Sequence, residues 1–383
     1  MKMLVVDDEQ DIELLIRQKF RRQIRDGEYE FVFASNGLDA LEKLRTEQGI
    51  EIILTDINMP VMDGLTLLMK VGELDRVLRA VVVSAYGDLG NIRTAMNRGA
   101  FDFLMKPIDF DDLEITIDKT RKQVEQIKEA MQEHSQLEAM HHELDIARTM
   151  QQSVLPSTGT LGDRNDIDLH ARMIAAREIG GDFYDFFMLD QDRLGFIIAD
   201  VSGKGIPAAL YMMLSRSLVR SRAHRDLSPA RCLKEANDVL CVNNATSMFV
   251  TLFYGILDLR DGVVRYCNGG HNSPFHLRWD GGVQALEQIG GPMLGAWEGA
   301  TYTEATFTMK PSESLFLYTD GITEAESAER EFFTTERLET ALEKRLNLTP
   351  MELVNSMIEA VNAFSAGAQQ SDDITAMALR YRP

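Results

Sequence analysis

The chain has 383 residues, of which 45% are apolar, and a formal net charge of −20 from 60 acidic and 40 basic residues. This length exceeds what one ordinary core uses, and the apolar content suffices for two, so we expect two or three domains. The negative charge opposes binding to a phosphate backbone or to an anionic membrane surface. Nucleic acid and membrane are therefore disfavoured as partners.

Apolar runs are too short for a membrane span, which requires roughly 18 residues, and two aspartates follow the start MKMLVV, where a signal peptide would need an apolar core. We therefore expect a cytoplasmic protein. The cysteines form no CxxC pair, which predicts buried thiols in place of disulfides or a thiolate metal site. They are Cys232, Cys241 and Cys267.

Short apolar runs alternate with helical patterns at the start of the chain. The runs are MLVV, FVFA, EIILTD and AVVVSA, with helices expected from about Ile12 to Arg25 and from near Asn36. The alternation predicts a doubly wound α/β fold with a parallel sheet and helices on both faces. Ligands of such sheets bind beyond the carboxyl ends of the strands, where the sequence gathers Asp7, Asp8 and Asp56.

Three carboxylates at one sheet edge repel one another unless a divalent cation lies among them, so this group predicts a magnesium site. An aspartate held by such a metal can attack a phosphoryl group as a nucleophile. Lys106, in the sequence MKP, would offer a cation to the new phosphate, and Ser84 would offer a hydroxyl.

The motifs VVDDE, LTDINMPVMDG, VVSAYG and FLMKP resemble the response-regulator receiver family, which has a flavodoxin-like fold, over residues 1–119. The resemblance implies that Asp56 accepts the phosphoryl group from a sensor histidine kinase or a phosphotransfer protein. It also implies that Mg²⁺ is held by Asp7, Asp8, Asp56 and the Asn58 carbonyl, and that phosphorylation is reported by Ser84, Phe103 and Lys106. The alternative is a receiver-shaped domain that never turns over phosphate.

Residues 111–154 contain no glycine and form one helical pattern that continues to Pro156. Two runs with steps of three and four meet in a step of three between His134 and Leu137, which predicts a coiled coil with a stammer. We expect a homodimer through a coiled-coil linker at residues 120–155, with a long helix packed on one domain as the alternative. The seam comprises Ile117, Thr120, Val124, Ile127, Met131, His134, Leu137, Met140, Leu144, Ala147, Gln151 and Val154.

The remaining segment, residues 156–383, contains many strand-like runs, among them LGFIIADV, MFVTLFYGILDL, VVRYC and SLFLYTD. Helical blocks lie at residues 206–223 and 229–244, and two further helices near 334–346 and 349–366 precede a final strand, ITAMALRY. The pattern predicts packed sheets flanked by helices.

A second set of aspartates lies at strand ends and glycine turns of this segment. A single aspartate in such a place is often a turn former or a helix cap. Together, beside glycines and without Cys or His at ligand spacing, the set favours two Mg²⁺ or Mn²⁺ ions, which can activate a water for attack on phosphorus. The set comprises Asp182, Asp185, Asp200, Asp320, Asp372 and Asp373.

The segments REIGGDFYDFF, IIADVSGKGIPAAL, GGHNSPF with GPMLG, LYTDGITEA and SDDITAM resemble the SpoIIE/RsbU class of the PPM family, the metal-dependent serine/threonine phosphatases. The resemblance implies an α+β layered β-sandwich. Asp200 would bridge the two ions, and Asp373 would lie behind the direct ligands. The implied metal set is Asp182, Asp200, the Val201 carbonyl, Asp320, Asp372 and Asp373.

Arg177 lies five residues before Asp182, where the resemblance implies an arginine that holds the substrate phosphate. The alternative is a surface arginine paired with an acid. Ser202 stands where the eukaryotic branch often has a histidine, so the leaving group would take its proton from metal-bound water or from His271, although such a histidine is more often structural. Lys204 lies in GKG, which lacks the Walker spacing, so nucleotide binding is weakly supported.

These observations predict a response regulator in which phosphorylation of Asp56 controls the hydrolysis of phosphoserine or phosphothreonine. By resemblance, the substrate would be a STAS-type anti-sigma-factor antagonist. Loss of metal ligands would instead mark a non-catalytic adaptor, and none of the main aspartates is missing. A DNA-binding regulator would need a basic recognition helix, which the sequence does not offer.

Overall fold

The computed structural model describes residues 1–74, 76–85, 88–157, 161, 164–225, 228–242 and 244–383. The chain divides into two compact units, Met1–Met140 and His141–Pro383. Helix α6 (Phe110–Val154) contributes residues to both of them. None of the described helices combines the length and the apolar character that crossing a bilayer requires.

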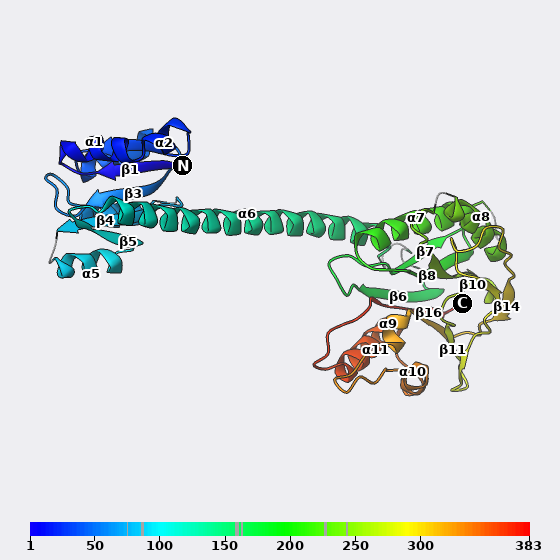
Figure 1. The fold of residues 1–383 in the computed structure, drawn as a ribbon. Helices are drawn as coiled ribbons and strands as arrows, with labels where there is room; N and C mark the ends of the chain where they lie inside the picture. Colours follow the sequence, from blue (N-terminus) through cyan, green and yellow to red (C-terminus); the bar gives the residue numbers. More distant parts are fainter. Residues whose placement is uncertain (75, 86–87, 158–160, 162–163, 226–227, 243) are drawn as a thin grey trace. The chain divides into compact units, whose positions relative to one another are not determined.

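The first unit is built on a parallel five-stranded sheet with the order β2-β1-β3-β4-β5 (Figure 1). Side chains alternate between its two faces: Leu4 and Val6 join one buried cluster, whereas Met3 and Val5 join the other. The predicted doubly wound fold is confirmed. Its elements before α6 are β1 (Lys2–Val6), α1 (Gln10–Lys19), α2 (Arg21–Arg25), β2 (Glu30–Ala34), α3 (Gly37–Thr46), β3 (Ile50–Asp56), α4 (Gly64–Gly72), β4 (Arg79–Ala85), α5 (Leu89–Asn97) and β5 (Asp102–Lys106).

The first predicted helix differs from the structure, because it is divided into α1 and α2 at Phe20. Phe20 leaves the helical region of backbone dihedral angles, with φ −94° and ψ 21°, and its ring is fully buried against Tyr29 and Phe31. Placing this ring in the core interrupts the helix, which periodicity alone does not reveal.

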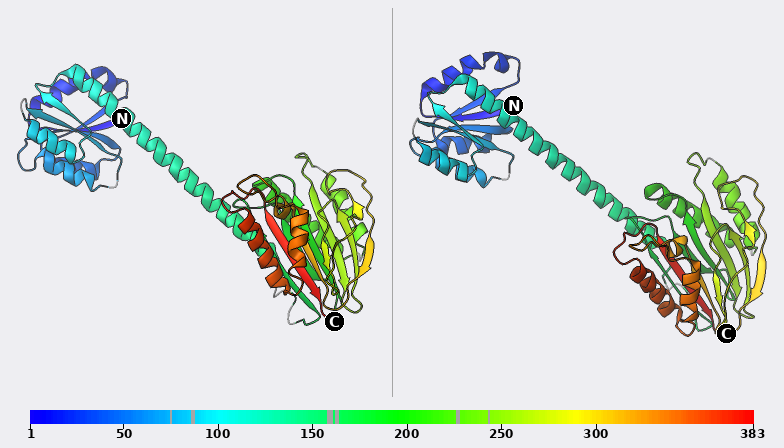
Figure 2. Two further views of the ribbon diagram at one scale, coloured as in Figure 1. Left: turned by 90° about the horizontal axis from the view of Figure 1, so that it is seen from below. Right: turned by 60° about the horizontal axis from the view of Figure 1, so that its bottom comes forward.

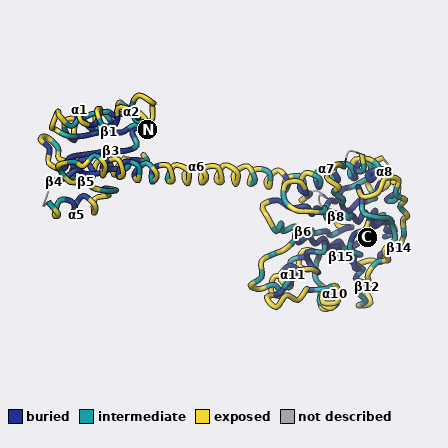
Figure 3. Tube along the Cα trace, in the orientation of Figure 1, coloured by how far each residue is buried: buried dark blue, intermediate teal, exposed yellow. Residues whose placement is uncertain are grey.

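Helix α6 confirms the long helix predicted at residues 111–154. Ile117, Thr120 and Val124 are fully buried in the core of the first unit, so these seam positions are not open to a partner helix and this part of the prediction is wrong. Lys128 also pairs with Glu51, at 2.7 Å. Residues 129–143 are all exposed (Figure 3), and for that stretch the coiled coil stays a prediction.

The second unit contains two sheets, and Figure 2 gives further views of their strands and helices. One has the order β13-β10-β9-β8-β7, with β14 paired to β10, and the other has the order β12-β11-β15-β16-β6. The strands are β6 (Ile167–Ile174), β7 (Phe183–Met188), β8 (Arg193–Val201), β9 (Val250–Asp258), β10 (Val263–Gly269), β11 (Phe275–Leu277), β12 (Val283–Ala285), β13 (Gly290–Gly291), β14 (Ala305–Thr308), β15 (Ser314–Tyr318) and β16 (Ile374–Tyr381).

The helices of the second unit are α7 (Ile206–Ala223), α8 (Pro229–Cys241), α9 (Asp320–Thr323), α10 (Thr335–Glu343) and α11 (Pro350–Phe364). Buried side chains of both sheets, such as Phe196 and Leu317, share one apolar cluster. A second cluster joins β8 and β9 to α7 and α8, and a third joins β15 and β16 to α10 and α11. The helices predicted near residues 206–223, 229–244, 334–346 and 349–366 are thus confirmed, with small differences at their ends.

Candidate functional site

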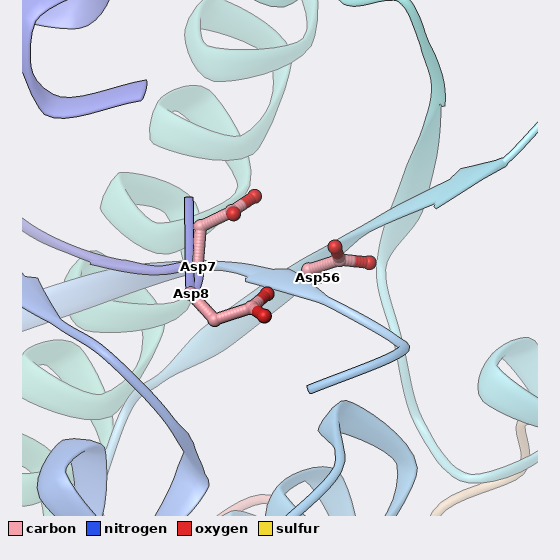
Figure 4. A group of neighbouring side chains, drawn as sticks. All are labelled: Asp7, Asp8 and Asp56. Atoms are coloured by element: carbon pink, nitrogen blue, oxygen red, sulfur yellow. The ribbon is translucent and has the colours of Figure 1, made fainter. Parts of the chain in front are cut away.

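The acidic group of the first unit lies at the carboxyl ends of β1 and β3 (Figure 4). These strands are adjacent and parallel, so their ends meet at one edge of the sheet. Asp7, Asp8 and Asp56 each offer an oxygen within 4.8 Å of the others. Three carboxylates at this spacing form an all-oxygen donor set, which fits Mg²⁺.

Lys106, at the end of β5, forms ion pairs with the carboxylates of this group. Its Nζ lies 2.6 Å from Asp56 Oδ2, 2.9 Å from Glu9 Oε1 and 3.1 Å from Asp7 Oδ2. Burial acts to lower the pKa of Lys106, but the hydrogen bonds to these carboxylates outweigh burial. The pKa of Lys106 is therefore raised, and the ammonium stays charged. Burial also raises the pKa of Asp7, while the Glu9 N–H and Lys106 act in the opposite direction.

Ser84 and Asn58 lie near the predicted phosphoacceptor. Ser84 Oγ on β4 is buried and has no hydrogen-bond partner in the part of the chain that the structure describes, which leaves its hydroxyl free for a phosphoryl oxygen. The Asn58 N–H donates to Asp56 Oδ1 at 3.2 Å. Phe103 on β5 is 38% exposed. The motif VVSAYG ends in residues 86–87, which lie outside the described residues.

The second acidic group lies where strands of both sheets end. Strand β7 begins where its antiparallel partner β8 ends, so Asp182 and Asp200 lie at the same end of one sheet. Strand β16 begins where β15 ends, so Asp320, Asp372 and Asp373 lie at one end of the other. Residues that are far apart in the sequence thereby become neighbours.

Like charges crowd one another in this group. Burial, and then Asp200, raise the pKa of Asp182. Burial, followed by Asp320 and Asp372, raises the pKa of Asp200 to about 7. Burial, followed by Glu324 and Asp372, raises the pKa of Asp320 to about 6. Since a divalent cation would relieve this repulsion and all the donors are oxygens, the residues fit Mg²⁺ or Mn²⁺.

Asp373 holds the loop that precedes β7. Its Oδ1 accepts from the Ala176 N–H at 2.8 Å, and its Oδ2 accepts from the N–H groups of Gly181 and Asp182 at 2.6 and 3.3 Å. A Cβ atom at Gly180 would lie 2.3 Å from the same Oδ2, so the loop needs glycine there. Because backbone donors engage both of its oxygens, Asp373 positions Asp182 through the loop.

Two further contacts shape the group. Thr319 Oγ1 donates to Asp182 Oδ2 at 2.7 Å and accepts from the Thr375 N–H at 3.1 Å. A Cβ atom at Gly181 would lie 2.9 Å from the Val201 carbonyl oxygen, so this oxygen faces the loop that carries Asp182. Sequence reasoning missed Thr319, although it directly precedes Asp320 in the motif LYTDG.

Lys204 lies at the second acidic group. Its motif, GKG, gave only weak support for nucleotide binding. The Lys204 Nζ is 2.9 Å from Asp372 Oδ2 and donates to the Ser371 carbonyl. It stands between Gly203 and Gly205, whose φ values of +85° and +75° favour glycine. The spacing of the motif gives no sign of this distant partner.

Asp185 and Arg177 differ in their surroundings from the other predicted residues. Asp185 is fully buried and pairs with Arg216 and Arg220 of α7 at 3.0 and 2.8 Å, so it belongs to an ion-pair network and not to the metal set. Arg177 is exposed and is not seen in an ion pair with any described residue. Its role in holding phosphate stays a prediction.

His271 is a structural residue in this arrangement. It is 2% exposed, its Nε2 lies 3.1 Å from the Tyr318 carbonyl oxygen, and its Nδ1 lies 2.9 Å from Thr251 Oγ1. Since a carbonyl oxygen can only accept, Nε2 carries the proton and Nδ1 accepts from the threonine hydroxyl. Burial lowers the pKa of His271 to about 4. The alternative in which it protonates the leaving group is therefore disfavoured.

Gln151, near the end of α6, contacts the loop that carries Asp182. Its Nε2 donates to the Gly180 carbonyl at 2.6 Å, and its Oε1 accepts from the Gly180 N–H at 3.2 Å. The side chain is only 4% exposed. The sequence pattern places Gln151 on the seam of a coiled coil, where this contact with the backbone of Gly180 could not be foreseen.

Comparison with known proteins agrees with these two sites. Residues 3–118 match the family described as response regulator receiver domain, and residues 190–382 match the family described as Stage II sporulation protein E (SpoIIE). The chain is similar to protein IcfG of Synechocystis sp., with 31% identity over 264 residues that cover 62% of this chain and 41% of IcfG. It is also similar to phosphoserine phosphatase RsbU of Bacillus subtilis, with 28% identity over 256 residues that cover 66% of this chain and 75% of RsbU.

The SiaA-PP2C domain of Pseudomonas aeruginosa has a similar fold, with a TM-score of 0.58 at 21% identity over 64% of this chain and 98% of that domain. The family match covers half of the chain and includes Asp200, Asp320, Asp372 and Asp373, whereas Asp182 precedes it. The chain therefore belongs to the SpoIIE family, and carries a response regulator receiver domain ahead of a PPM-type protein phosphatase domain.

Proposed function

We propose that this protein is a response regulator that hydrolyses phosphoserine or phosphothreonine on a partner protein under the control of Asp56. The convergence of Asp182, Asp200, Asp320 and Asp372 from two sheets carries this proposal. A partner-binding adaptor would have no need of four crowded carboxylates, whose mutual repulsion opposes folding unless cations bind. The division into residues 1–119, 120–155 and 156–383, with the last part a layered β-sandwich, belongs to the same proposal.

Two Mn²⁺ or Mg²⁺ ions would supply the phosphatase site with an activated water and with positive charge for the phosphoryl oxygens. Asp200 would be shared between them, with Asp182, Asp320, Asp372 and the Val201 carbonyl as further ligands. This assignment rests on the burial and the mutual pKa effects of these carboxylates.

Asp373 and Thr319 would keep the ligand Asp182 in place. Asp373 fixes the backbone of the loop before β7, and Thr319 fixes the orientation of the Asp182 carboxylate. Arg177, which is exposed on the same loop, would be free to meet a phosphoryl oxygen of the substrate.

In the receiver domain, Asp56 would take a phosphoryl group from a sensor histidine kinase or a phosphotransfer protein. The phosphorus–nitrogen bond of a phosphohistidine donor would break as a phosphorus–oxygen bond to Asp56 forms. Mg²⁺ would be held by Asp7, Asp8, Asp56 and the Asn58 carbonyl. The unpartnered Ser84 hydroxyl and the Lys106 ammonium would then bind the new phosphoryl oxygens, with Phe103 responding to the change.

Helix α6 would carry the change to the phosphatase site. Its first turns belong to the receiver core, and Gln151 near its other end holds the loop that carries Asp182. A homodimer through the exposed residues 129–143 would let the two α6 helices of the dimer change their packing together. This mechanism requires no direct contact between the domains.

The substrate is proposed from similarity. RsbU of Bacillus subtilis is a phosphoserine phosphatase, and IcfG is matched over less than half of its length. We propose a phosphorylated STAS-type anti-sigma-factor antagonist as the partner of this chain.

The decisive experiment measures manganese-dependent hydrolysis of a phosphoserine peptide by the full chain, with and without a phosphoryl mimic on the receiver. Asp200→Ala and Asp320→Ala should abolish hydrolysis, and Asp56→Ala should abolish only the response to the mimic. Asp145→Ala, at an exposed position of α6, is the matched control. If the wild type binds the phosphorylated partner but hydrolyses neither it nor the peptide under any condition, the adaptor replaces the enzyme.

A further inference from the structure

One cation faces the phosphatase aspartates without a role in the proposed function. The Lys204 Nζ lies 2.9 Å from Asp372 Oδ2 and donates to the Ser371 carbonyl, so it lies beside the aspartates that precede β16. In the described part of the second unit, no other lysine or arginine is seen in an ion pair with Asp182, Asp200, Asp320, Asp372 or Asp373. Its charge therefore acts on the region where phosphate chemistry is proposed.

The backbone before Lys204 is held by hydrogen bonds, whereas the Lys204 side chain is partly exposed. Glycines with positive φ stand on both sides of it. The preceding Ser202 is tied to Phe249 by two hydrogen bonds, from the Ser202 N–H to the Phe249 carbonyl and from the Phe249 N–H to Ser202 Oγ, both 2.9 Å. Helix α7 begins directly after the turn, at Ile206. The Lys204 side chain is 40% exposed, so its ammonium can turn about a fixed point at the rim of the site.

Metal binding at Asp372 would compete with this contact, because Lys204 lies at Asp372 Oδ2 and the other oxygen, Oδ1, already accepts from the Asp373 N–H at 2.9 Å. An ammonium and a divalent cation would compete for the same oxygen, and they repel each other at contact distance. A phosphomonoester carries two negative charges near neutral pH, and the aspartates already offset much of the charge of the ions. A further cation at the rim would therefore stabilise the bound phosphate.

We propose that Lys204 is a substrate-binding residue, whose ammonium leaves Asp372 when metal binds and then contacts the phosphoryl group of the substrate. The inference rests on the proposed function, because it assumes that the aspartates hold metal. It identifies the ligand of this lysine as a phosphomonoester dianion or free phosphate. Lys204 would thus neutralise Asp372 in the absence of metal and bind the phosphoryl group of the substrate in its presence.

The test is the binding of Mn²⁺, and then of inorganic phosphate, to the full chain by calorimetry, without any turnover. In Lys204→Met, phosphate should bind roughly tenfold to a hundredfold more weakly to the Mn²⁺-loaded protein, as expected for one lost charge-assisted hydrogen bond. Mn²⁺ should bind at least as tightly as in the wild type, because its competitor for Asp372 is gone. Lys204→Arg, which keeps the charge, should restore most of the phosphate affinity.

Lys344→Met is the matched control, since Lys344 is exposed at the end of α10 and forms no ion pair with a described residue. Unchanged phosphate affinity in Lys204→Met would overturn the inference, and so would weaker Mn²⁺ binding, which would mark Lys204 as a structural support of the site. Mn²⁺ that binds to the receiver domain contributes equally to every titration, because all the variants have the same receiver, so it does not affect the comparison between them. If phosphate binding depends on Lys204 but no ester is hydrolysed, the inference stands and the proposed function fails. If esters are hydrolysed and phosphate binding ignores Lys204, only the inference fails.

Discussion

Replacing Gln151 tests whether α6 controls the phosphatase loop. Gln151→Met keeps the length of the side chain but removes both hydrogen bonds to Gly180. Each buried backbone group that loses its partner costs about 1–3 kcal/mol, so the contact is worth about 2–6 kcal/mol. The same loop carries the N–H groups that Asp373 binds, and its loosening should displace Asp182.

We therefore expect Gln151→Met to require at least about thirtyfold more Mn²⁺ for half-maximal hydrolysis, which corresponds to the lower limit of that range. The assay is a Mn²⁺ titration of phosphoserine-peptide hydrolysis, together with thermal unfolding of the metal-free protein. Gln152→Met is the matched control, because Gln152 is the exposed neighbour on the same helix. If the two variants need the same Mn²⁺ concentration, the contact does not position the site and the reasoning fails.

Three further predictions concern single side chains. Since the folded state raises the pKa of Asp200 from 3.8 to about 7, metal-free protein should lose stability as pH rises from about 4 to 7. Asp200→Asn should remove up to about 4 kcal/mol of this pH-dependent loss of stability. Urea unfolding with a chelator, at pH values from about 4 to 7, measures it, and an equal pH dependence in the wild type and the variant would contradict the prediction. His271→Gln should lower stability by about 1–3 kcal/mol and leave the pH profile of hydrolysis unchanged, because both ring nitrogens already have partners; a shifted profile would show that His271 transfers a proton. Asp56→Asn should abolish labelling by acetyl phosphate in mass spectrometry, and labelling that persists would place the phosphoacceptor elsewhere.

The receiver fold and its acidic group could be predicted from local sequence. Alternating apolar runs specify a parallel sheet, and the carboxyl ends of its strands must meet, so Asp7 and Asp56 are neighbours by topology alone. For the phosphatase domain, the residue pattern predicted a metal set that included Asp185, and the resemblance was needed to select the ligands. The reason is that the long-range topology of two sheets, which periodicity does not determine, brings these aspartates together.

Side-chain partners were the least predictable part. Asp182 and Asp185 stand three positions apart at the start of β7. Asp182 accepts from Thr319, whereas Asp185 pairs with arginines of α7. Which partner each finds depends on how helices and sheets pack. The seam predicted for α6 is a second example. Apolar residues spaced by three and four occur both in coiled coils and in helices that pack against the core of a domain, so the spacing alone could not distinguish the two.

The position of β16 between β15 and β6 also constrains how the enzyme is made. Among the described strands of its unit, β6 comes first in the sequence and pairs only with β16, which comes last. A nascent chain therefore holds β6 without this pairing until β16 is made, and Asp372 and Asp373 are made after the other aspartates of the acidic group. An intermediate that ends before Asp372 therefore lacks part of the acidic group, and the order of the strands delays assembly of the site until β16 is made.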